Sequence, residues 1–153
     1  MNTLYDSDFY AWTQEQAKLL REQKWESVDI ANVVEEIESL GKQERRELRN
    51  RFGVLLGHLL KWQYQPDYHG NSWQATIREQ RRRIRTLLQE SPSLQHCLEE
   101  VLRTGYENGL DLAVRETNLP YSIFPESCPY TLEQTLDVEF LPHGGVSKLS
   151  EQR

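Results

Sequence analysis

Residues 42–64 read KQERRELRNRFGVLLGHLLKWQY, and this stretch decides the fold class. Its apolar side chains recur three or four residues apart, which is the spacing of one face of an α-helix. The side chains on this face are Leu48, Phe52, Leu55, Leu59 and Trp62. Pro66 follows and ends the helix, because proline has no amide hydrogen and clashes with the preceding turn. The stretch therefore predicts an amphipathic helix whose apolar face must be covered by other helices.

A second helical segment, IANVVEEIESL at residues 30–40, precedes this stretch, with Gly41 between the two. Asp29 is a suitable N-cap, and the segment has an apolar face of its own. That face consists of Ile30, Val33, Val34, Ile37 and Leu40. Because glycine weakens a helix interior, we expect a kink or a brief interruption at Gly41. Further upstream, residues 8–23 predict another helix, capped by Asp6 or Ser7, with Phe9, Trp12, Leu19 and Leu20 near one stripe.

Two more helices are predicted after Pro66. Asn71, with Gln74 at capping-box spacing, opens the helix SWQATIREQRRRIRTLLQE at residues 72–90. Ser91 and Pro92 then open a helix that runs to about Glu116. Leu94, Leu98, Val101 and Leu112 share its apolar face. Near that face lie Gly105 and Gly109, and two glycines four residues apart let another helix approach closely.

The last part of the chain has a different character. Residues 118–130, NLPYSIFPESCPY, contain three prolines, which forbid a regular helix. Their aromatic and apolar side chains predict an ordered strap across the helices. Thr131 caps a short helix over residues 132–137, and the remainder, residues 143–153, predicts a flexible tail. We therefore expect an all-α fold: one helical domain over residues 4–142, a bundle of about four to five main helices with a C-terminal proline-rich strap and short helix.

Composition excludes several classes of function. The 153 residues include 18 Lys or Arg and 24 Asp or Glu, a net charge of −6, which disfavours general binding to nucleic acid. No apolar run approaches the ~20 residues that cross a bilayer. The N-terminal sequence MNTLYDSDFY lacks the pattern of a signal peptide, and we expect a cytoplasmic protein. Cys97 and Cys128 predict reduced thiols, and we expect no disulfide, metal or cofactor.

The densest group of functional side chains lies at residues 58–83, HLLKWQYQPDYHGNSWQATIREQRRR. Here Arg81 falls inside the apolar stripe of its helix, and a buried guanidinium needs an acceptor. Glu36 or Glu38 is the expected acceptor. The functional interpretation is a polar pocket that binds an anionic or polar ligand. Its candidate residues are Glu36, Glu38, His58, Trp62, Trp73, Arg78 and Arg81.

A structural interpretation of the same residues is simpler, and we favour it. It has an Arg–Glu pair between helices, tryptophans that anchor the core, and a half-buried His58 bonded to a carbonyl. The cluster Arg78, Arg81, Arg82, Arg83 and Arg85 points in several directions around its helix, which argues against a nucleic-acid surface.

Metal chemistry is a weaker alternative. Glu35 with Glu38, and Glu44 with Glu47, are carboxylate pairs of the kind that hold magnesium or iron in helical bundles. The facing helix, however, offers few carboxylates, so a solvated face explains them more simply. A three-histidine site of His58, His69 and His96 finds no support in their spacing. Nucleophile motifs and glycine-rich phosphate loops are absent from the sequence.

Several blocks of the sequence, taken in order, resemble a known family. They are DFYAWTQEQAKLLR, EEIESLGKQERRELRNR, LLGHLLKWQYQP, SWQATIREQRRRI, SPSL and FPESCPYTLEQ. Together, across residues 5–142, they resemble domain-of-unknown-function family 29, a mainly bacterial family. The resemblance implies a single all-helical domain and carries no activity, substrate or catalytic residues.

The function expected from these observations is a non-catalytic cytoplasmic binding or interaction protein, with a protein partner or a small anionic ligand. The expectation rests on the absence of a complete catalytic constellation in a chain rich in charge and aromatic residues. The alternative is a ligand-binding protein or metal-dependent hydrolase that uses the Glu/His/Trp/Arg cluster between helices.

Overall fold

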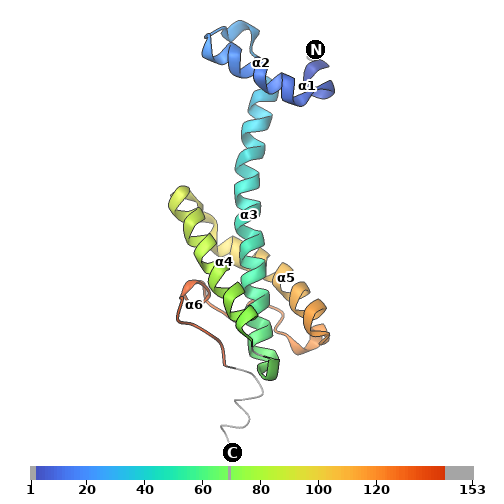
Figure 1. Ribbon diagram of the computed structural model, residues 1–153, viewed down its shortest axis with the longest axis vertical. Coiled ribbons are helices and arrows are strands. Elements are labelled where there is room, and N and C mark those ends of the chain that lie inside the picture. The colour runs from blue at the N-terminus through green and yellow to red at the C-terminus, as the bar shows by residue number, and fades with distance from the viewer. Residues whose placement is uncertain (1–2, 69, 144–153) are drawn as a thin grey trace, which may run out of the picture. The chain divides into compact units, whose positions relative to one another are not determined.

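The computed structural model describes residues 3–68 and 70–143, and within these ranges it contains helices and no strand (Figure 1). The α-helices are α1 (Thr3–Ser7), α2 (Phe9–Arg21), α3 (Ile30–Tyr64), α4 (Asn71–Glu90), α5 (Leu98–Thr117) and α6 (Leu132–Leu136). Short 3₁₀ turns lie at Trp25–Ser27, Pro66–Tyr68, Pro92–Cys97 and Tyr121–Ile123. The predicted all-α fold of about four to five main helices with a short C-terminal helix is therefore confirmed, and four of the described helices are long. None of the described helices is both long and apolar enough to cross a membrane.

We predicted a kink or a brief interruption at Gly41, but helix α3 runs without interruption from Ile30 to Tyr64, so the predicted interruption is wrong. A glycine inside a helix costs only about 1 kcal/mol relative to alanine, and the residues on both sides of Gly41 favour the helix. No described glycine adopts a positive φ angle. The end of α3, directly before the proline at 66, agrees with the prediction.

The chain divides into two compact units, Met1–Glu44 and Arg45–Arg153, and α3 contributes residues to both. Below they are called unit 1 and unit 2. The single domain predicted over residues 4–142 stays a prediction. Of the predicted tail, only His143 belongs to the described residues.

Unit 1 is organised around Trp12, which is 3% exposed. Its indole Nε1 donates a hydrogen bond to Oδ2 of Asp29 at 3.1 Å, and the rings of Tyr5 and Phe9 pack against it at centroid distances of 4.7 and 5.6 Å. The backbone amide of Asp29 in turn donates to Oε1 of Gln16 at 2.7 Å. These bonds fix the residue that directly precedes α3 to the buried face of α2.

The predicted start of the first long helix is wrong. Asp8 is the N-cap of α2, where its Oδ1 accepts a hydrogen bond from the amide of Ala11 at 3.1 Å. Asp6 and Ser7 instead lie within the preceding short helix, α1. A cap needs a carboxylate or hydroxyl three residues before a free amide, and Asp8 meets this requirement.

The core of unit 2 forms where α4 and α5 cover the second half of α3 (Figure 1). From α3, six residues of this core are fully buried: Leu48, Phe52, Leu55, Leu56, Leu59 and Leu60. Ile77 and Ile84 of α4, and Val101, Leu102 and Tyr106 of α5, pack with them. The predicted stripe on residues 48–59 is thus confirmed as the centre of the core.

Two pairs of glycines bring α3 and α5 into close contact. A Cβ added to Gly105 would lie 3.0 Å from Cβ of Phe52, and one added to Gly57 would lie 3.0 Å from the carbonyl oxygen of Gly109. The predicted close approach at Gly105 and Gly109 is confirmed, and its counterpart on α3 is the equally spaced pair Gly53 and Gly57. Backbones at this separation leave no room for a side chain.

The starts of α4 and α5 differ from those predicted. Gly70 is the N-cap of α4, and Asn71 is its first residue, without a side-chain cap bond. Pro92 occupies the first position after Ser91 as predicted, but it opens a 3₁₀ turn that precedes α5. The proline ring fixes φ at a value that suits either kind of helix, so it marks the start and not the type.

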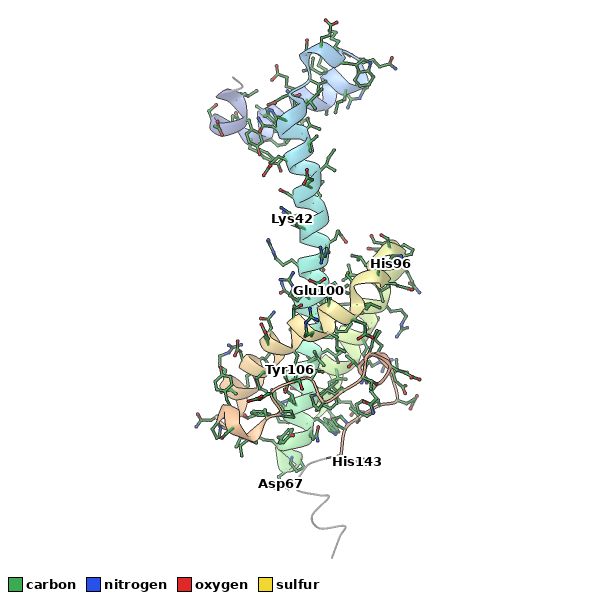
Figure 2. The ribbon with its side chains drawn as sticks, turned by 180° about the vertical axis from the view of Figure 1, so that it is seen from behind. Lys42, Asp67, His96, Glu100, Tyr106 and His143 are labelled. Carbon is green, nitrogen blue, oxygen red and sulfur yellow. The ribbon has the colours of Figure 1, made fainter. Side chains whose placement is uncertain are left out.

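The segment after α5 is held to unit 2 by two tyrosines. The hydroxyl of Tyr106, labelled in Figure 2, donates to the carbonyl oxygen of Pro125. The hydroxyl of Tyr130 donates to Oε1 of Gln63 at 2.7 Å. Burial raises the pKa of both phenols. The two hydroxyls thus satisfy their hydrogen bonds while their rings fill the core.

The capping box predicted at Thr131 is confirmed. Its Oγ1 accepts from the amide of Gln134, and Oε1 of Gln134 accepts from the amide of Thr131, each at 3.0 Å. Cys97 and Cys128 are both free thiols, as predicted. Burial raises the pKa of the Cys128 thiol.

Candidate arginine-lined cavity

A cavity of about 460 Å³ lies in unit 2 between α4 and the residues that follow α6. Four arginines of α4 line it together with apolar and polar side chains. The lining residues are Gln74, Ile77, Arg78, Arg81, Arg82, Arg85, Val138, Glu139 and Leu141. A second cavity of about 250 Å³ shares Arg81 and Arg85 with the first. The first and larger of the two is called the arginine cavity below.

Arg81 is 3% exposed and forms the inner wall of the arginine cavity. Its Nε donates to the carbonyl oxygen of Thr135 at 2.9 Å, and its Nη2 donates to that of Gln134 at 3.3 Å. These carbonyls belong to the last turn of α6, where a helix has unpaired acceptors and a partial negative charge. Burial lowers the pKa of Arg81, and the nearby charge of Asp137 opposes that shift.

The prediction that Glu36 or Glu38 accepts the hydrogen bonds of Arg81 is therefore wrong. The guanidinium is satisfied by backbone carbonyls that lie more than fifty residues later in the chain. The prediction considered only charged acceptors, yet helix-terminal carbonyls serve a buried arginine equally well because they need donors themselves.

The other three arginines of the cavity are Arg78, Arg82 and Arg85, and all three are exposed. Their spacing of four and then three residues places them on one ridge of α4. None of them forms an ion pair with another residue in the described part of the chain. The expectation that this cluster points in several directions is wrong for these arginines and correct for Arg83, which pairs with Glu79 at 3.0 Å.

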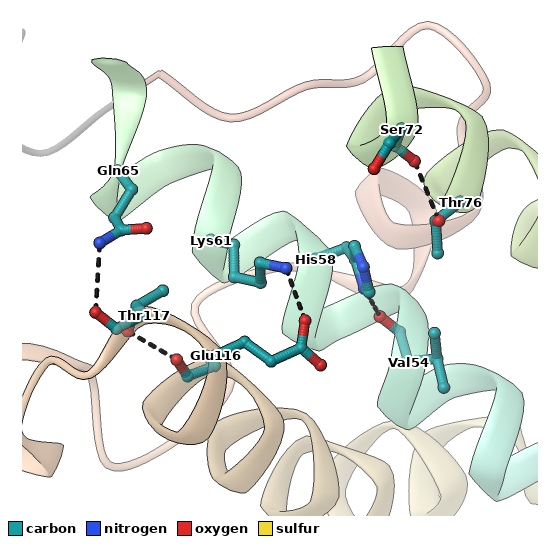
Figure 3. A network of polar contacts seen from close by, with 9 residues as sticks. Val54, His58, Lys61, Gln65, Ser72, Thr76, Glu116 and Thr117 are labelled. Atoms are coloured by element: carbon teal, nitrogen blue, oxygen red, sulfur yellow. Dashed lines mark hydrogen bonds and ion pairs between the residues drawn. The ribbon is translucent and has the colours of Figure 1, made fainter. Parts of the chain in front are cut away.

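A separate polar network surrounds Lys61 on α3 (Figure 3). Lys61 is 4% exposed, and its Nζ lies 2.7 Å from Oε1 of Glu116 on α5. The same ammonium group lies 4.4 Å from the ring centre of Trp73 on α4. The charge is thus balanced by a carboxylate and an aromatic face, which is how a buried lysine is tolerated.

His58 lies one helical turn before Lys61 and is 8% exposed. Its Nδ1 is 2.9 Å from the carbonyl oxygen of Val54 (Figure 3). Because a carbonyl only accepts, this bond requires a hydrogen on Nδ1. Burial lowers the pKa of His58, and the charge of Lys61 lowers it further, while the Val54 bond and Glu116 act in the opposite direction. The predicted bond of His58 to a carbonyl is confirmed, but the side chain is buried and not half-buried as predicted.

The remaining candidate residues are dispersed. Glu36 accepts a hydrogen bond from the hydroxyl of Tyr5 within unit 1, and this contact raises the pKa of Tyr5 to about 12. Glu38 is exposed on α3, also in unit 1. In unit 2, Trp62 is half-buried against the core, and Trp73 lies under the Lys61 ammonium. Arg78 and Arg81 are the two candidates that share the arginine cavity.

Metal-binding geometry is not seen in the part of the chain that the structure describes. There, no three His, Cys, Asp or Glu side chains lie close enough to hold a metal ion. Of the three histidines considered from the sequence, His69 lies outside the described residues.

Sequence reasoning missed Lys61 and Glu116, and it did not assign Arg82 and Arg85 to the candidate site. The missed signal for the arginines was their spacing: positions 78, 82 and 85 form one ridge, from which Arg83 departs. Lys61 offered a weaker signal, a charged residue within the run LLGHLLKW, whose neighbours all favour the core.

The fold and the cavity together define an all-helical protein with an arginine-lined hollow. The family model described as "Domain of unknown function DUF29" matches residues 4–141, which is nearly the whole chain. The chain belongs to this family. No curated protein and no solved structure matches the chain significantly.

Proposed function

We propose that this protein is a non-catalytic, cytoplasmic binding protein whose ligand places an anionic group in the arginine cavity. The observation that carries the proposal is the ridge of Arg78, Arg82 and Arg85, whose three exposed guanidinium groups line a hollow of about 460 Å³. None of these three groups forms an ion pair with a carboxylate of the described residues. Like charges at this spacing repel one another, so the ridge destabilises α4 unless an anion offsets it.

The chemistry of the lining favours an anion with an apolar part. A guanidinium binds a carboxylate or phosphate through two parallel hydrogen bonds, which lysine cannot do. Ile77, Val138 and Leu141 supply apolar surface beside the arginines. The volume falls within the range of small-molecule pockets, and it also admits an acidic side chain with an apolar neighbour. Small organic anions and acidic protein segments therefore share the chemistry that fits.

Charge at longer range agrees with such a ligand. Although the whole chain is acidic, residues 45–153 contain 14 Lys or Arg and 14 Asp or Glu, so unit 2 carries no net charge. An anion approaching the arginine cavity therefore meets no net repulsion from this unit. Glu139 is the acidic residue of the lining, and its carboxylate repels a negative charge placed next to it, so the anionic group of the ligand should lie on the arginine side of the cavity. The free thiols Cys97 and Cys128 fit a reducing compartment.

Calorimetric titration tests the proposal with three probes: inorganic phosphate, benzoate, and a short peptide that alternates glutamate and leucine. We expect one organic probe to bind the wild type and to lose at least about tenfold in affinity in Arg82→Gln/Arg85→Gln. Arg83→Gln, on the same helix but outside the lining, is the matched control and should bind like the wild type. Binding of the peptide alone would identify a protein partner, and binding of benzoate a small ligand.

Two results would overturn the proposal. In the first, no probe binds the wild type. In the second, Arg83→Gln weakens binding as much as the double variant does, which would mean that general charge and not the cavity holds the anion. Chemical conversion of a bound probe, followed by chromatography, would contradict its non-catalytic part.

A further inference from the structure

Unit 1 carries the entire net charge of the protein. Its 44 residues contain 4 Lys or Arg and 10 Asp or Glu, a net charge of −6, which equals that of the full chain. Unit 1 is therefore a strongly acidic body, in contrast to unit 2. A body of this charge attracts cationic partners and repels anionic ones over about a Debye length.

Most of the exposed large apolar side chains also lie in unit 1. Of the eleven exposed large apolar side chains in the described part of the chain, eight belong to unit 1. They are Phe9, Tyr10, Leu20, Trp25, Ile30, Val34, Ile37 and Leu40. Single exposed apolar residues are ordinary, but a contiguous group of them marks an interaction surface.

The exposed apolar residues on α3 form an ordered stripe. Ile30, Val34 and Ile37 follow one another at intervals of four and three residues, so they share one face, and they are 62%, 45% and 62% exposed. Leu40, 62% exposed, extends this stripe toward Lys42, which is labelled in Figure 2. This pattern is the one a helix presents when it pairs with a second helix.

The rim of this stripe is acidic. Glu38 and Glu35 follow one flank at three-residue spacing, and both are exposed. Glu36 lies on the opposite flank, where Tyr5 already binds its carboxylate. The stripe therefore has an apolar centre and a negative edge, the arrangement that gives an interface both affinity and partner selection.

We propose that this face of α3, from Ile30 to Leu40, is a docking surface for an amphipathic helix of a partner protein that carries Lys or Arg beside its apolar side chains. Such a helix lays its apolar face on the stripe and places its cations against Glu35 and Glu38. A second copy of this chain fits less well, because it would bring a second unit of charge −6 against the first. This surface lies in unit 1 and is independent of the arginine cavity.

The experiment compares two synthetic helical peptides with identical leucine positions, one flanked by Lys and Arg and the other by Glu. Their affinities for the full chain are measured by fluorescence anisotropy. All proteins carry Arg82→Gln/Arg85→Gln, so that the acidic peptide has no arginine cavity to occupy. We expect the basic peptide to bind at least about tenfold more tightly than the acidic one, and less tightly as salt is added.

Two variants locate the binding. Ile37→Ser removes apolar surface, and Glu35→Gln/Glu38→Gln removes the negative edge; each should weaken binding of the basic peptide by about fivefold or more. Ile123→Ser, at a 47% exposed apolar position in unit 2, is the matched control and should leave the affinity unchanged. All four substituted positions are exposed, so we expect folding to be preserved, and far-ultraviolet circular dichroism checks this.

Several outcomes would overturn the proposal. The first two are that neither peptide binds and that both bind equally. The third is that Ile37→Ser and Ile123→Ser weaken binding of the basic peptide equally. Sedimentation provides the test of a second copy: a wild-type dimer that Ile37→Ser converts to a monomer would show that the stripe pairs with itself.

Discussion

Gly109 of α5 lies against Gly53 of α3 so closely that a Cβ added to Gly109 would come 2.9 Å from the carbonyl oxygen of Gly53. The same added Cβ would also lie 2.9 Å from the amide nitrogen of Gly57. Both neighbours are backbone atoms, which cannot move away without shifting a helix.

Gly109→Ala should therefore destabilise the protein by about 1 to 3 kcal/mol, although alanine favours a helix more than glycine does. Gly41→Ala is the control, because a Cβ there would meet nothing within 4 Å apart from its chain neighbours and the backbone of its own helix turn. That change should stabilise by up to about 1 kcal/mol through helix propensity alone. Urea denaturation measures both, and two changes of the same sign would refute the close-contact explanation.

Arg81 and Arg85 line the same cavity, but replacing Arg81 should lower the stability of the protein much more than replacing Arg85. Arg81→Ala removes the side-chain donor to the carbonyl of Thr135 and opens a hole under α6, at a cost of about 2 to 4 kcal/mol. The carbonyl of Gln134 loses its weaker bond to Arg81 but keeps the backbone amide of Asp137 as a donor. Arg85→Ala removes an exposed side chain and should change stability by less than about 0.5 kcal/mol. Thermal denaturation distinguishes the two, and comparable losses would mean that Arg85 has a structural role as well.

The ion pair of Lys61 and Glu116 predicts an asymmetric response. Glu116→Gln leaves a buried ammonium without its carboxylate and should cost roughly 1 to 3 kcal/mol, less than for a fully buried pair because Glu116 is 42% exposed. Lys61→Met keeps the apolar stem and should cost under about 1 kcal/mol. Adding Lys61→Met to Glu116→Gln should restore stability. A double variant no more stable than Glu116→Gln would exclude this charge-burial explanation.

The lowered pKa of His58 predicts a loss of stability in acid. Its folded pKa lies below the value of 6.5 expected for the unfolded chain, so the unfolded state binds the proton first as the pH falls. The free energy of unfolding should therefore decrease as the pH falls below about 6.5. His58→Gln should reduce the pH dependence of the free energy of unfolding. His96→Gln, at an exposed position, serves as the control. Parallel pH profiles for the wild type and His58→Gln would exclude this contribution.

Local patterns in the sequence predicted much of the fold. The stripe from Leu48 to Leu59 is the core of unit 2, and the box at Thr131 and Gln134 caps α6 as expected. Such features depend on residues within one or two turns of each other, and their spacing is visible in the sequence. The close approach of a second helix at Gly105 and Gly109 could also be predicted, because two glycines at this spacing allow it whichever helix packs there.

The candidate site was harder to predict because its partners are distant in sequence. Arg81 required an acceptor, but nothing local indicates that the end of α6 would supply it. Lys61 similarly depends on Glu116 and Trp73, which come from two different helices. Only the tertiary arrangement decides among many chemically equivalent acceptors. At Gly41 the prediction failed for another reason: a local preference of about 1 kcal/mol was too small to break a long helix.

The two phenols that hold the C-terminal segment also give that segment an optical label. Tyrosinate absorbs ultraviolet light differently from the neutral phenol, and five of the seven tyrosines lie elsewhere. Since burial opposes ionisation of Tyr106 and Tyr130, their absorbance change in alkali is shifted to higher pH, and release of the segment would remove that shift. The pKa values of Tyr5, Tyr64 and Tyr121 are raised as well, so the part of the late absorbance change that is lost in Tyr106→Phe/Tyr130→Phe is the part that reports on this segment.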